Sequence, residues 1–102
     1  MELKENSGRL EVELPNAVDL AVAGELRDVL LDALARDSAA DVVLKAAMVE
    51  RASTAAIQVL LAAANAFRLA ARRLEIENAQ EALAATFRHL GLAEDFDNLI
   101  VS

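Results

Sequence analysis

The chain has 102 residues, no cysteine and a formal net charge of −7 at pH 7. This length predicts a single domain over residues 1–102 whose core needs neither disulfides nor metal. The missing cysteines exclude a disulfide framework, thiolate metal ligands and thiol nucleophiles. The acidic charge argues against nucleic acid as a partner, because phosphate backbones select basic surfaces.

The N-terminus lacks the basic and then apolar regions of a signal peptide. The apolar run at residues 59–64 falls well short of the roughly 20 residues that a membrane-spanning helix needs. We therefore expect a soluble, cytoplasmic protein with no direct membrane insertion.

The first elements in the chain are two short strands. Residues 9–14 alternate polar and apolar side chains, which is typical of a half-buried strand. Ser7 and Gly8 suit a tight turn from a shorter strand around residues 2–5. Strand geometry predicts that Glu11 and Glu13 point outward, away from the core.

A helix is expected from about residue 21 to residue 36, with Asp19 near its N-terminus as a cap or first-turn acid. Residues 18–22 are by composition also compatible with a strand. The apolar side chains of this helix recur at helical spacing and define one face: Leu26, Val29, Leu30, Ala33 and Leu34.

The second half of the chain continues the alternation of strands and helices. Residues 42–44 are apolar without alternation, which favours a buried central strand. A helix over residues 54–71, a strand over 74–77 and a helix over 80–90 follow, with Gly91 as the C-terminal cap. The tail through residue 101 is expected to dock back on the domain. The order ββαβαβα predicts an α/β fold: a mixed, mostly parallel sheet with helices largely on one face.

The second helix opens with two adjacent hydroxyl residues, Ser53 and Thr54. A helix N-terminus carries unpaired N–H groups and a partial positive charge, so it favours a phosphate. In one interpretation Ser53 is the N-cap and Thr54 is simply the next residue. In the other, one of the two hydroxyls is a phosphorylation switch. Both are true together if Ser53 caps the helix and Thr54 carries the signal.

One side of this helix is predicted to pack in the core, and its members share helical spacing: Ala56, Val59, Leu60, Ala63, Phe67 and Ala70. The opposite side carries a polar stripe with Leu61 in its middle: Thr54, Gln58, Asn65, Arg68 and Arg72. The stripe is either a solvated helix face or a partner surface with Leu61 as an apolar anchor. An exposed Leu61 would also allow a weak homodimer.

Three segments together resemble the STAS domain, the fold of bacterial anti-sigma factor antagonists. Ser-Thr-Ala-Ala-Ile-Gln-Val-Leu-Leu at residues 53–61 is similar to the family's Asp-Ser-Ser-Gly-Leu-x-x-Leu-Leu. Asn-Ala-Val-Asp at residues 16–19, followed by Leu26-Arg27, is similar to its Gly-Glu-Leu-Asp segment, and Gly91-Leu92 matches its closing region. The helix is also similar to STAS proteins found beside bacterial chemotaxis genes.

The resemblance implies a non-catalytic interaction switch in the regulation of transcription. Its hydroxyl would be phosphorylated by a partner serine/threonine kinase that is itself the anti-sigma factor. By position Thr54 is the phosphoacceptor and Ser53 the second choice. Ser53, Ala56 and Lys45 depart from the family's aspartate, glycine and acidic strand end. The expected partner-binding residues are Ser53, Thr54, Gln58, Leu61, Asn65 and Arg68.

Two other functions stay open. One is a constitutive accessory subunit, similar to STAS proteins of bacterial lipid-transport ABC complexes, and the other is a small-ligand sensor. An enzyme is not expected: His89 is the only histidine, and no catalytic triad, metal-ligand cluster or glycine-rich phosphate loop accompanies it. No cofactor and no metal are expected.

Overall fold

The computed structural model describes residues 1–36 and 40–101, and for the last two of these it describes the backbone alone. Its main sheet has the strand order β1-β2-β4-β6-β7, in which β1 is antiparallel to β2 and the other neighbours are parallel. The strands are β1 (Lys4–Asn6), β2 (Arg9–Glu13), β4 (Val42–Lys45), β6 (Leu74–Glu77) and β7 (Ile100–Val101).

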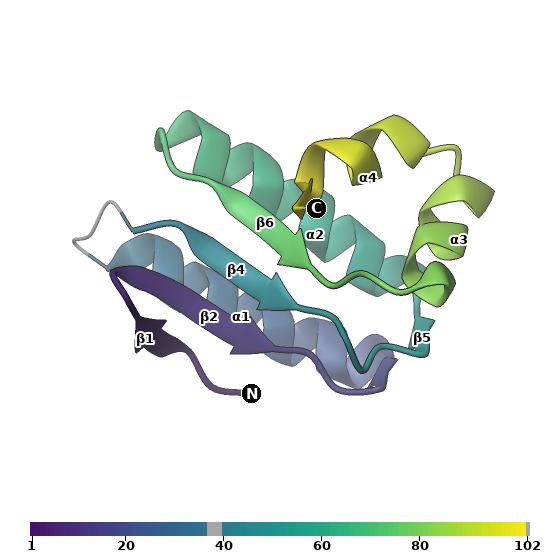
Figure 1. The fold of residues 1–102 in the computed structure, drawn as a ribbon, viewed down its shortest axis with the longest axis horizontal. Helices are drawn as coiled ribbons and strands as arrows, with labels where there is room; N and C mark the ends of the chain where they lie inside the picture. The colour runs from purple at the N-terminus through teal and green to yellow at the C-terminus, as the bar shows by residue number, and fades with distance from the viewer. Residues whose placement is uncertain (37–39, 102) are drawn as a thin grey trace.

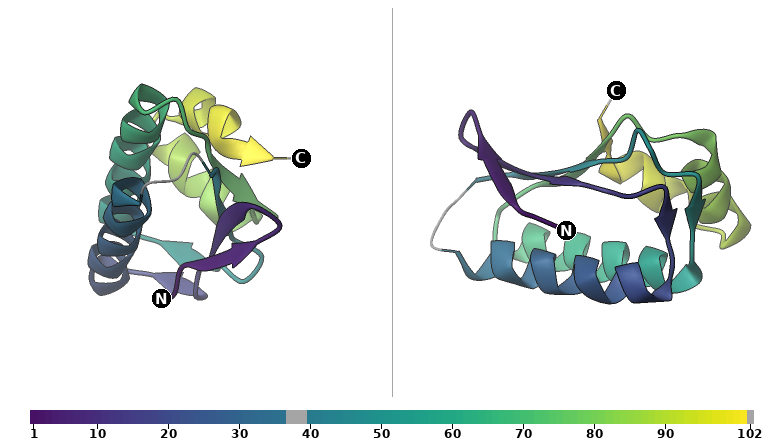
Figure 2. Two further views of the ribbon diagram at one scale, coloured as in Figure 1. Left: turned by 90° about the vertical axis from the view of Figure 1, so that its left-hand side faces the viewer. Right: turned by 90° about the horizontal axis from the view of Figure 1, so that it is seen from below.

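The longest helices are α1 (Leu20–Ala35) and α2 (Thr54–Leu69), which lie side by side against one face of this sheet (Figures 1 and 2). Two shorter helices, α3 (Glu81–His89) and α4 (Ala93–Leu99), pack at the β6 end. This arrangement confirms the predicted α/β fold with a mixed, mostly parallel sheet. A second ladder joins β3 (Ala17–Val18) to β5 (Arg51–Ala52) in parallel and was not predicted, because strands of two residues leave no periodic signal.

Local sequence signals account for most of the element boundaries. Ser7 and Gly8 have φ angles of 54° and 81°, as a two-residue hairpin turn between twisted strands requires. The Asp19 carboxylate accepts the Val22 N–H at 3.0 Å and caps α1. Gly91 has a φ of 73°, which allows the chain to leave α3 in the left-handed conformation.

Helix α2 ends at Leu69, two residues before the predicted end. Ala71 takes a left-handed φ of 57°, and the Arg72 N–H donates to the Phe67 carbonyl at 2.8 Å. This is a Schellman-type helix C-terminus without the usual glycine, so the sequence carried no signal that the helix ends here. As a result Ala70 is exposed and is not part of the core, contrary to the prediction.

The core lies between the sheet and the helices. The strand register aligns Leu10, Val42 and Leu74 in one row, and the next inward row is Val12, Leu44 and Ile76. All six are buried. The tail closes this core as α4 and β7: Phe96 packs on Phe87 with ring centroids 4.9 Å apart, which confirms the expected docking of the tail.

The other face of the sheet carries charged side chains, among them Glu11, which points outward as predicted. Glu11 points away from the helices but is only 8% exposed, because Arg9, Lys45 and Asn6 surround its carboxylate. Its oxygens lie 2.9 Å from Arg9 Nη2 and 3.5 Å from Lys45 Nζ. Burial opposes ionisation, but the Asn6 hydrogen bond and the charges of Lys45 and Arg9 outweigh it and hold the pKa of Glu11 below its usual 4.5.

We expect Glu11→Gln to lower the Tm at pH 7, and the difference from the wild type to shrink as the solution is acidified. A carboxyl whose pKa is lowered by folding contributes stability above its unfolded pKa, and this contribution is lost as the pH falls through the folded pKa. Thermal unfolding from pH 7 down to about pH 3, below the ordinary glutamate pKa, measures the effect. The control is Glu13→Gln, an exposed glutamate two residues along the strand. A Glu11→Gln difference that stays constant over this range would contradict the assignment.

Candidate functional site

The site begins where β5 leads into α2. Ser53 has an extended backbone (φ −82°, ψ 161°), and its Oγ accepts the Ala56 N–H at 3.1 Å. Ser53 is therefore the N-cap, an interaction that typically contributes about 1 kcal/mol. Thr54 is the first residue of α2 and is exposed. Within the described residues its hydroxyl has no hydrogen-bond partner. The two hydroxyls thus have different structural roles.

The short β3–β5 ladder holds this position in place. The Asn16 carbonyl accepts the N–H groups of Glu50 and Arg51 at 2.7 and 3.0 Å, and the Ser53 N–H donates to the Val18 carbonyl at 2.9 Å. These bonds join the segment that precedes α1 to the segment that precedes α2. The N-termini of the two helices are consequently fixed at the same edge of the domain (Figure 2, right).

The electrostatics at Thr54 suit a negative group. The first turn of α2 contains no acidic residue. In the part of the chain that the structure describes, the N–H groups of Thr54 and Ala55 make no hydrogen bond, whereas that of Ala56 is taken by Ser53. Free N–H groups and the positive end of the helix dipole favour an anion. The domain itself can therefore tolerate a phosphate on Thr54.

The predicted stripe on α2 is divided between two neighbouring surfaces. Gln58 is exposed and lies at the groove between α1 and α2. Asn65 and Arg68 are exposed on the side toward α4, where Arg68 Nη2 lies 2.5 Å from Asn65 Oδ1. Thr54, Gln58, Asn65 and Arg68 therefore form a convex ridge rather than a single pocket.

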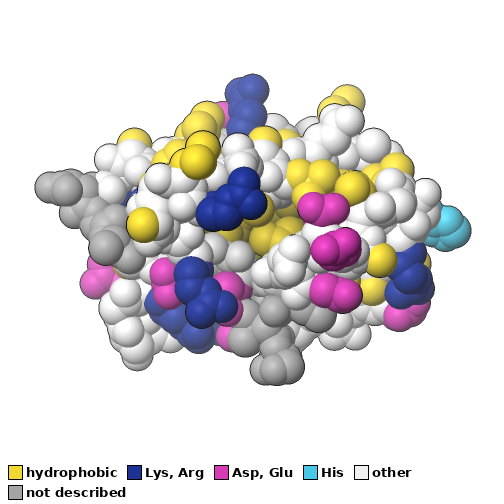
Figure 3. Space-filling view, turned by 90° about the horizontal axis from the view of Figure 1, so that it is seen from above, with side chains coloured by type: hydrophobic (Ala, Val, Ile, Leu, Met, Phe, Trp, Pro, Cys, Tyr) yellow, Lys and Arg dark blue, Asp and Glu magenta, His cyan; other side chains and the backbone are white. Residues whose placement is uncertain are grey.

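Leu61 is half-buried and packs against the core, contrary to the prediction of an exposed apolar anchor. It lines a hollow of about 420 Å³ beside α4, together with Leu74 and Leu99. Figure 3 looks onto this side and shows apolar surface between basic and acidic side chains. Helix α4, which the sequence pattern did not predict, lies beside this hollow and contributes Leu99 to its lining. The weak homodimer through Leu61 stays a prediction.

Arg72 does not belong to the stripe either. It lies beyond the end of α2 and is only 7% exposed. Its guanidinium donates to the carbonyls of Ala33 and Ala40 at 3.0 Å and sits 5.0 Å from the centre of the Phe67 ring. Arg72 is a structural residue that joins the end of α1 to the turn after α2.

The sequence reasoning missed two exposed apolar side chains near the helix N-termini. Leu20, the first residue of α1, is 74% exposed, and Met48, in the segment between β4 and β5, is 57% exposed. Met48 lines a surface hollow with Asn16 and Gln80. Single exposed apolar residues carry no periodic signal, so only the folded arrangement reveals them.

Two further findings bear on the kind of protein. No helix among the described residues has both the length and the hydropathy to cross a bilayer. Residues 1–36 and 40–101 also contain no cluster of three or more His, Asp or Glu side chains placed to hold a metal ion.

The fold and the hydroxyl pair at the start of α2 define a regulatory domain of the STAS class. A family model described as "Mlab, STAS domain" matches residues 1–101, so the chain belongs to the STAS domain family. Domains of this family are generally non-catalytic and act in regulation through protein–protein contacts. A search of curated proteins found no match. Membership of the chemotaxis-associated subgroup stays a prediction.

Proposed function

We propose that this protein is a phosphorylation-controlled interaction switch of the anti-sigma factor antagonist type, with Thr54 as the phosphoacceptor. The observation that carries the proposal is the division of roles at the start of α2. Ser53 is engaged as the N-cap, while the Thr54 hydroxyl is exposed and unbonded among the described residues. A kinase can reach Thr54 without breaking the cap.

The mechanism follows from the different solvation of a phosphate on Thr54 in the free domain and in the complex. A phosphate adds about −1.5 to −2 charges at neutral pH. In the free domain, water and the free N–H groups of Thr54 and Ala55 stabilise this charge. A partner that covers Thr54 has to desolvate the charge, at an effective cost of several kcal/mol unless it supplies a counter-charge. Phosphorylation therefore leaves the fold intact and weakens the interface.

The proposed partner is a serine/threonine kinase-type anti-sigma factor or related signalling protein in the bacterial cytoplasm, where ATP is available to the kinase. The partner-contacting residues start at Ser53 and Thr54 and continue along the ridge of α2, with Leu61 contributing from its half-buried position. The further contacts are Gln58, Asn65 and Arg68. The proposal treats residues 1–102 as one domain that carries this surface.

The direct test is intact-mass spectrometry with site mapping on protein purified from its native host. We expect a species heavier by about 80 Da, one phosphoryl group, that maps to Thr54. Phosphate on Ser53 would keep the switch but overturn the residue assignment. Protein that is unmodified under all growth conditions tested would overturn the switch and favour a constitutive accessory subunit.

A further inference from the structure

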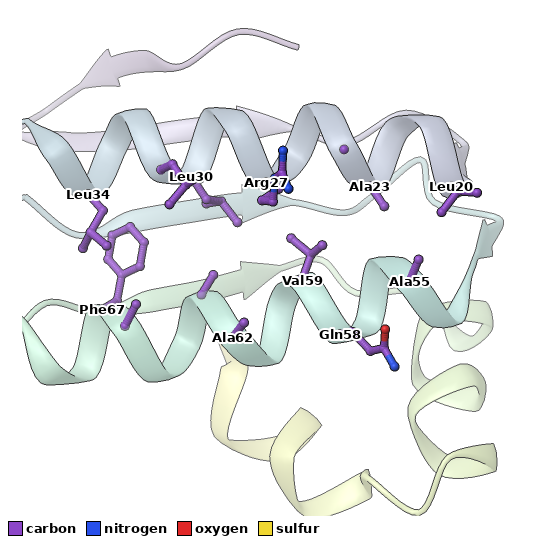
Figure 4. Close-up of a pocket in the computed structure, with 14 residues that line it drawn as sticks. Leu20, Ala23, Arg27, Leu30, Leu34, Ala55, Gln58, Val59, Ala62 and Phe67 are labelled. Atoms are coloured by element: carbon purple, nitrogen blue, oxygen red, sulfur yellow. The ribbon is translucent and has the colours of Figure 1, made fainter.

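The outer surface of the two-helix layer contains an apolar groove between α1 and α2 (Figure 4). The groove has a volume of about 500 Å³ and is lined by 14 residues, of which Arg27 is the only charged one. A quarter of all residues in this chain are charged. Because interface centres are depleted in charge, this face has the composition of an interface and not of an ordinary solvated surface.

The large apolar side chains that are exposed at this groove lie on α1, whereas Val59 and Phe67 of α2 are partly or fully buried. Helix α1 contributes Leu20 and Leu31, which are 74% and 55% exposed. Helix α2 contributes alanines at Ala55, Ala62 and Ala66. One wall thus carries protruding side chains and the other has room to receive them. An isologous interface needs both parts of the fit on the same surface.

The residues on the two helices also lie at matching positions along the helix axes. In Figure 4, Leu20 lies near Ala55 at one end of the groove, Leu30 lies opposite Ala62, and Leu34 faces Phe67 at the other end. Leu31 follows Leu30 directly, so it falls at the height of the turn between Ala62 and Ala66. A two-fold axis parallel to the helices would place α1 of one copy over α2 of the other without changing these heights.

We infer that the groove is the interface of a homodimer in which Leu20 and Leu31 of each copy pack onto the alanine surface of α2 in the other. Leu20 meets Ala55, and Leu31 meets Ala62 and Ala66. Arg27 keeps its ion pair with Asp28, whose oxygen lies 3.3 Å from Arg27 Nη2.

The size of the face limits the area that the dimer can bury. Two helices of 16 residues present a surface about 24 Å long and about 20 Å wide. Face-to-face packing would bury about 1,000 Å² over the two copies, which is near the lower limit for a specific interface. An interface of this size is typical of weak, reversible association.

Sedimentation equilibrium on the purified chain tests the inference. Leu31→Glu places a carboxylate on the apolar seam and should raise the Kd at least about tenfold. The matched control is Leu90→Glu, because Leu90 is 40% exposed and does not line the groove. It should leave the Kd unchanged. A wild-type chain that is monomeric up to about 1 mM would overturn the inference, as would a Kd unaffected by Leu31→Glu.

Cross-linking tests the geometry and does not rely on the glutamate variant. The chain has no cysteine, so single-cysteine chains give an unambiguous readout. A mixture of Leu31→Cys and Ala66→Cys chains should be joined by a short bifunctional maleimide. Leu31→Cys with Ala55→Cys should not, because Ala55 lies about 16 Å further along the helix. Efficient linkage of Leu31→Cys to Leu20→Cys chains would indicate antiparallel packing of α1 on itself and overturn the proposed arrangement. The inference would also be overturned if the groove bound a different protein and never a second copy of this chain.

Discussion

Arg72→Ala is expected to lower the free energy of unfolding by about 2–4 kcal/mol, or the Tm by roughly 10–25 °C for a domain of this size. Arg72 donates to the Ala33 carbonyl at 3.0 Å and to the Ala40 carbonyl from both Nε and Nη2, at 3.1 and 3.0 Å. It also donates to the Leu34 carbonyl at 3.4 Å. Denaturant and thermal unfolding followed by circular dichroism measure the loss.

The physical reason is that one cation serves the end of α1 and the segment before β4 together. The last carbonyls of a helix have no partner within the helix and carry partial negative charge. The guanidinium supplies several N–H donors in a fixed plane and packs over the Phe67 ring. Its removal takes hydrogen bonds from the carbonyls of Ala33, Leu34 and Ala40, at a place where Arg72 itself is only 7% exposed.

The neighbouring arginine provides the matched control. The Arg73 side chain is 73% exposed and forms only a surface ion pair with Glu75 at 3.6 Å. Arg73→Ala should therefore change the stability by no more than about 0.5 kcal/mol. Arg72→Lys keeps the positive charge but loses the planar guanidinium with its several N–H donors. It should therefore restore less than half of the free energy of unfolding that Arg72→Ala loses. Equal effects of the two alanine variants would show that Arg72 does not join these segments.

Thr54→Glu is expected to weaken the complex with the signalling partner at least about tenfold, whereas Thr54→Ala should preserve it. The carboxylate imitates part of the phosphate charge, and a partner that covers Thr54 must desolvate it. A penalty of about 1.4 kcal/mol already corresponds to a tenfold change in Kd. Tagged variants expressed in the native host, with the bound partner quantified by mass spectrometry, provide the measurement.

A charge added elsewhere separates a specific effect from a general one. Ala93→Glu introduces the same charge at the exposed first residue of α4, so it should leave partner recovery unchanged. The melting temperatures of the Thr54 variants should lie close together, because the free N–H groups at the start of α2 tolerate an acid. Equal recovery of the partner by Thr54→Glu and Thr54→Ala would reject the phosphorylation switch.

Much of the fold could be predicted because its signals are local. Asp19 and Ser53 cap helices through N–H groups three residues away, and the Ser7-Gly8 turn needs only its own backbone freedom. The apolar periodicity of α1 and of β2 requires no knowledge of what packs on them. The same reasoning located Ser53 and Thr54 at the start of α2, but it left open which hydroxyl is the cap.

The errors arose where a residue's environment depends on distant segments. Leu61 was placed on an exposed stripe by helical geometry, which specifies the side of the helix but not which distant segments pack beside it. Strand geometry predicted correctly that Glu11 points outward, but not that Lys45 and Arg9 bury it from neighbouring positions on the sheet. Helical spacing also assigned Arg72 to a helix that ends three residues earlier.

The sequence by itself determined the order of most elements, the α/β class, the approximate starts of the two long helices and the resemblance to the STAS family, since each rests on patterns among residues close in the chain. Only the tertiary structure decided that Leu61 is half-buried, that Arg72 joins segments more than 30 residues apart, and that α1 and α2 enclose an apolar groove. Those features depend on how the strand order brings the two helices together, and this long-range packing leaves no periodic pattern in the chain.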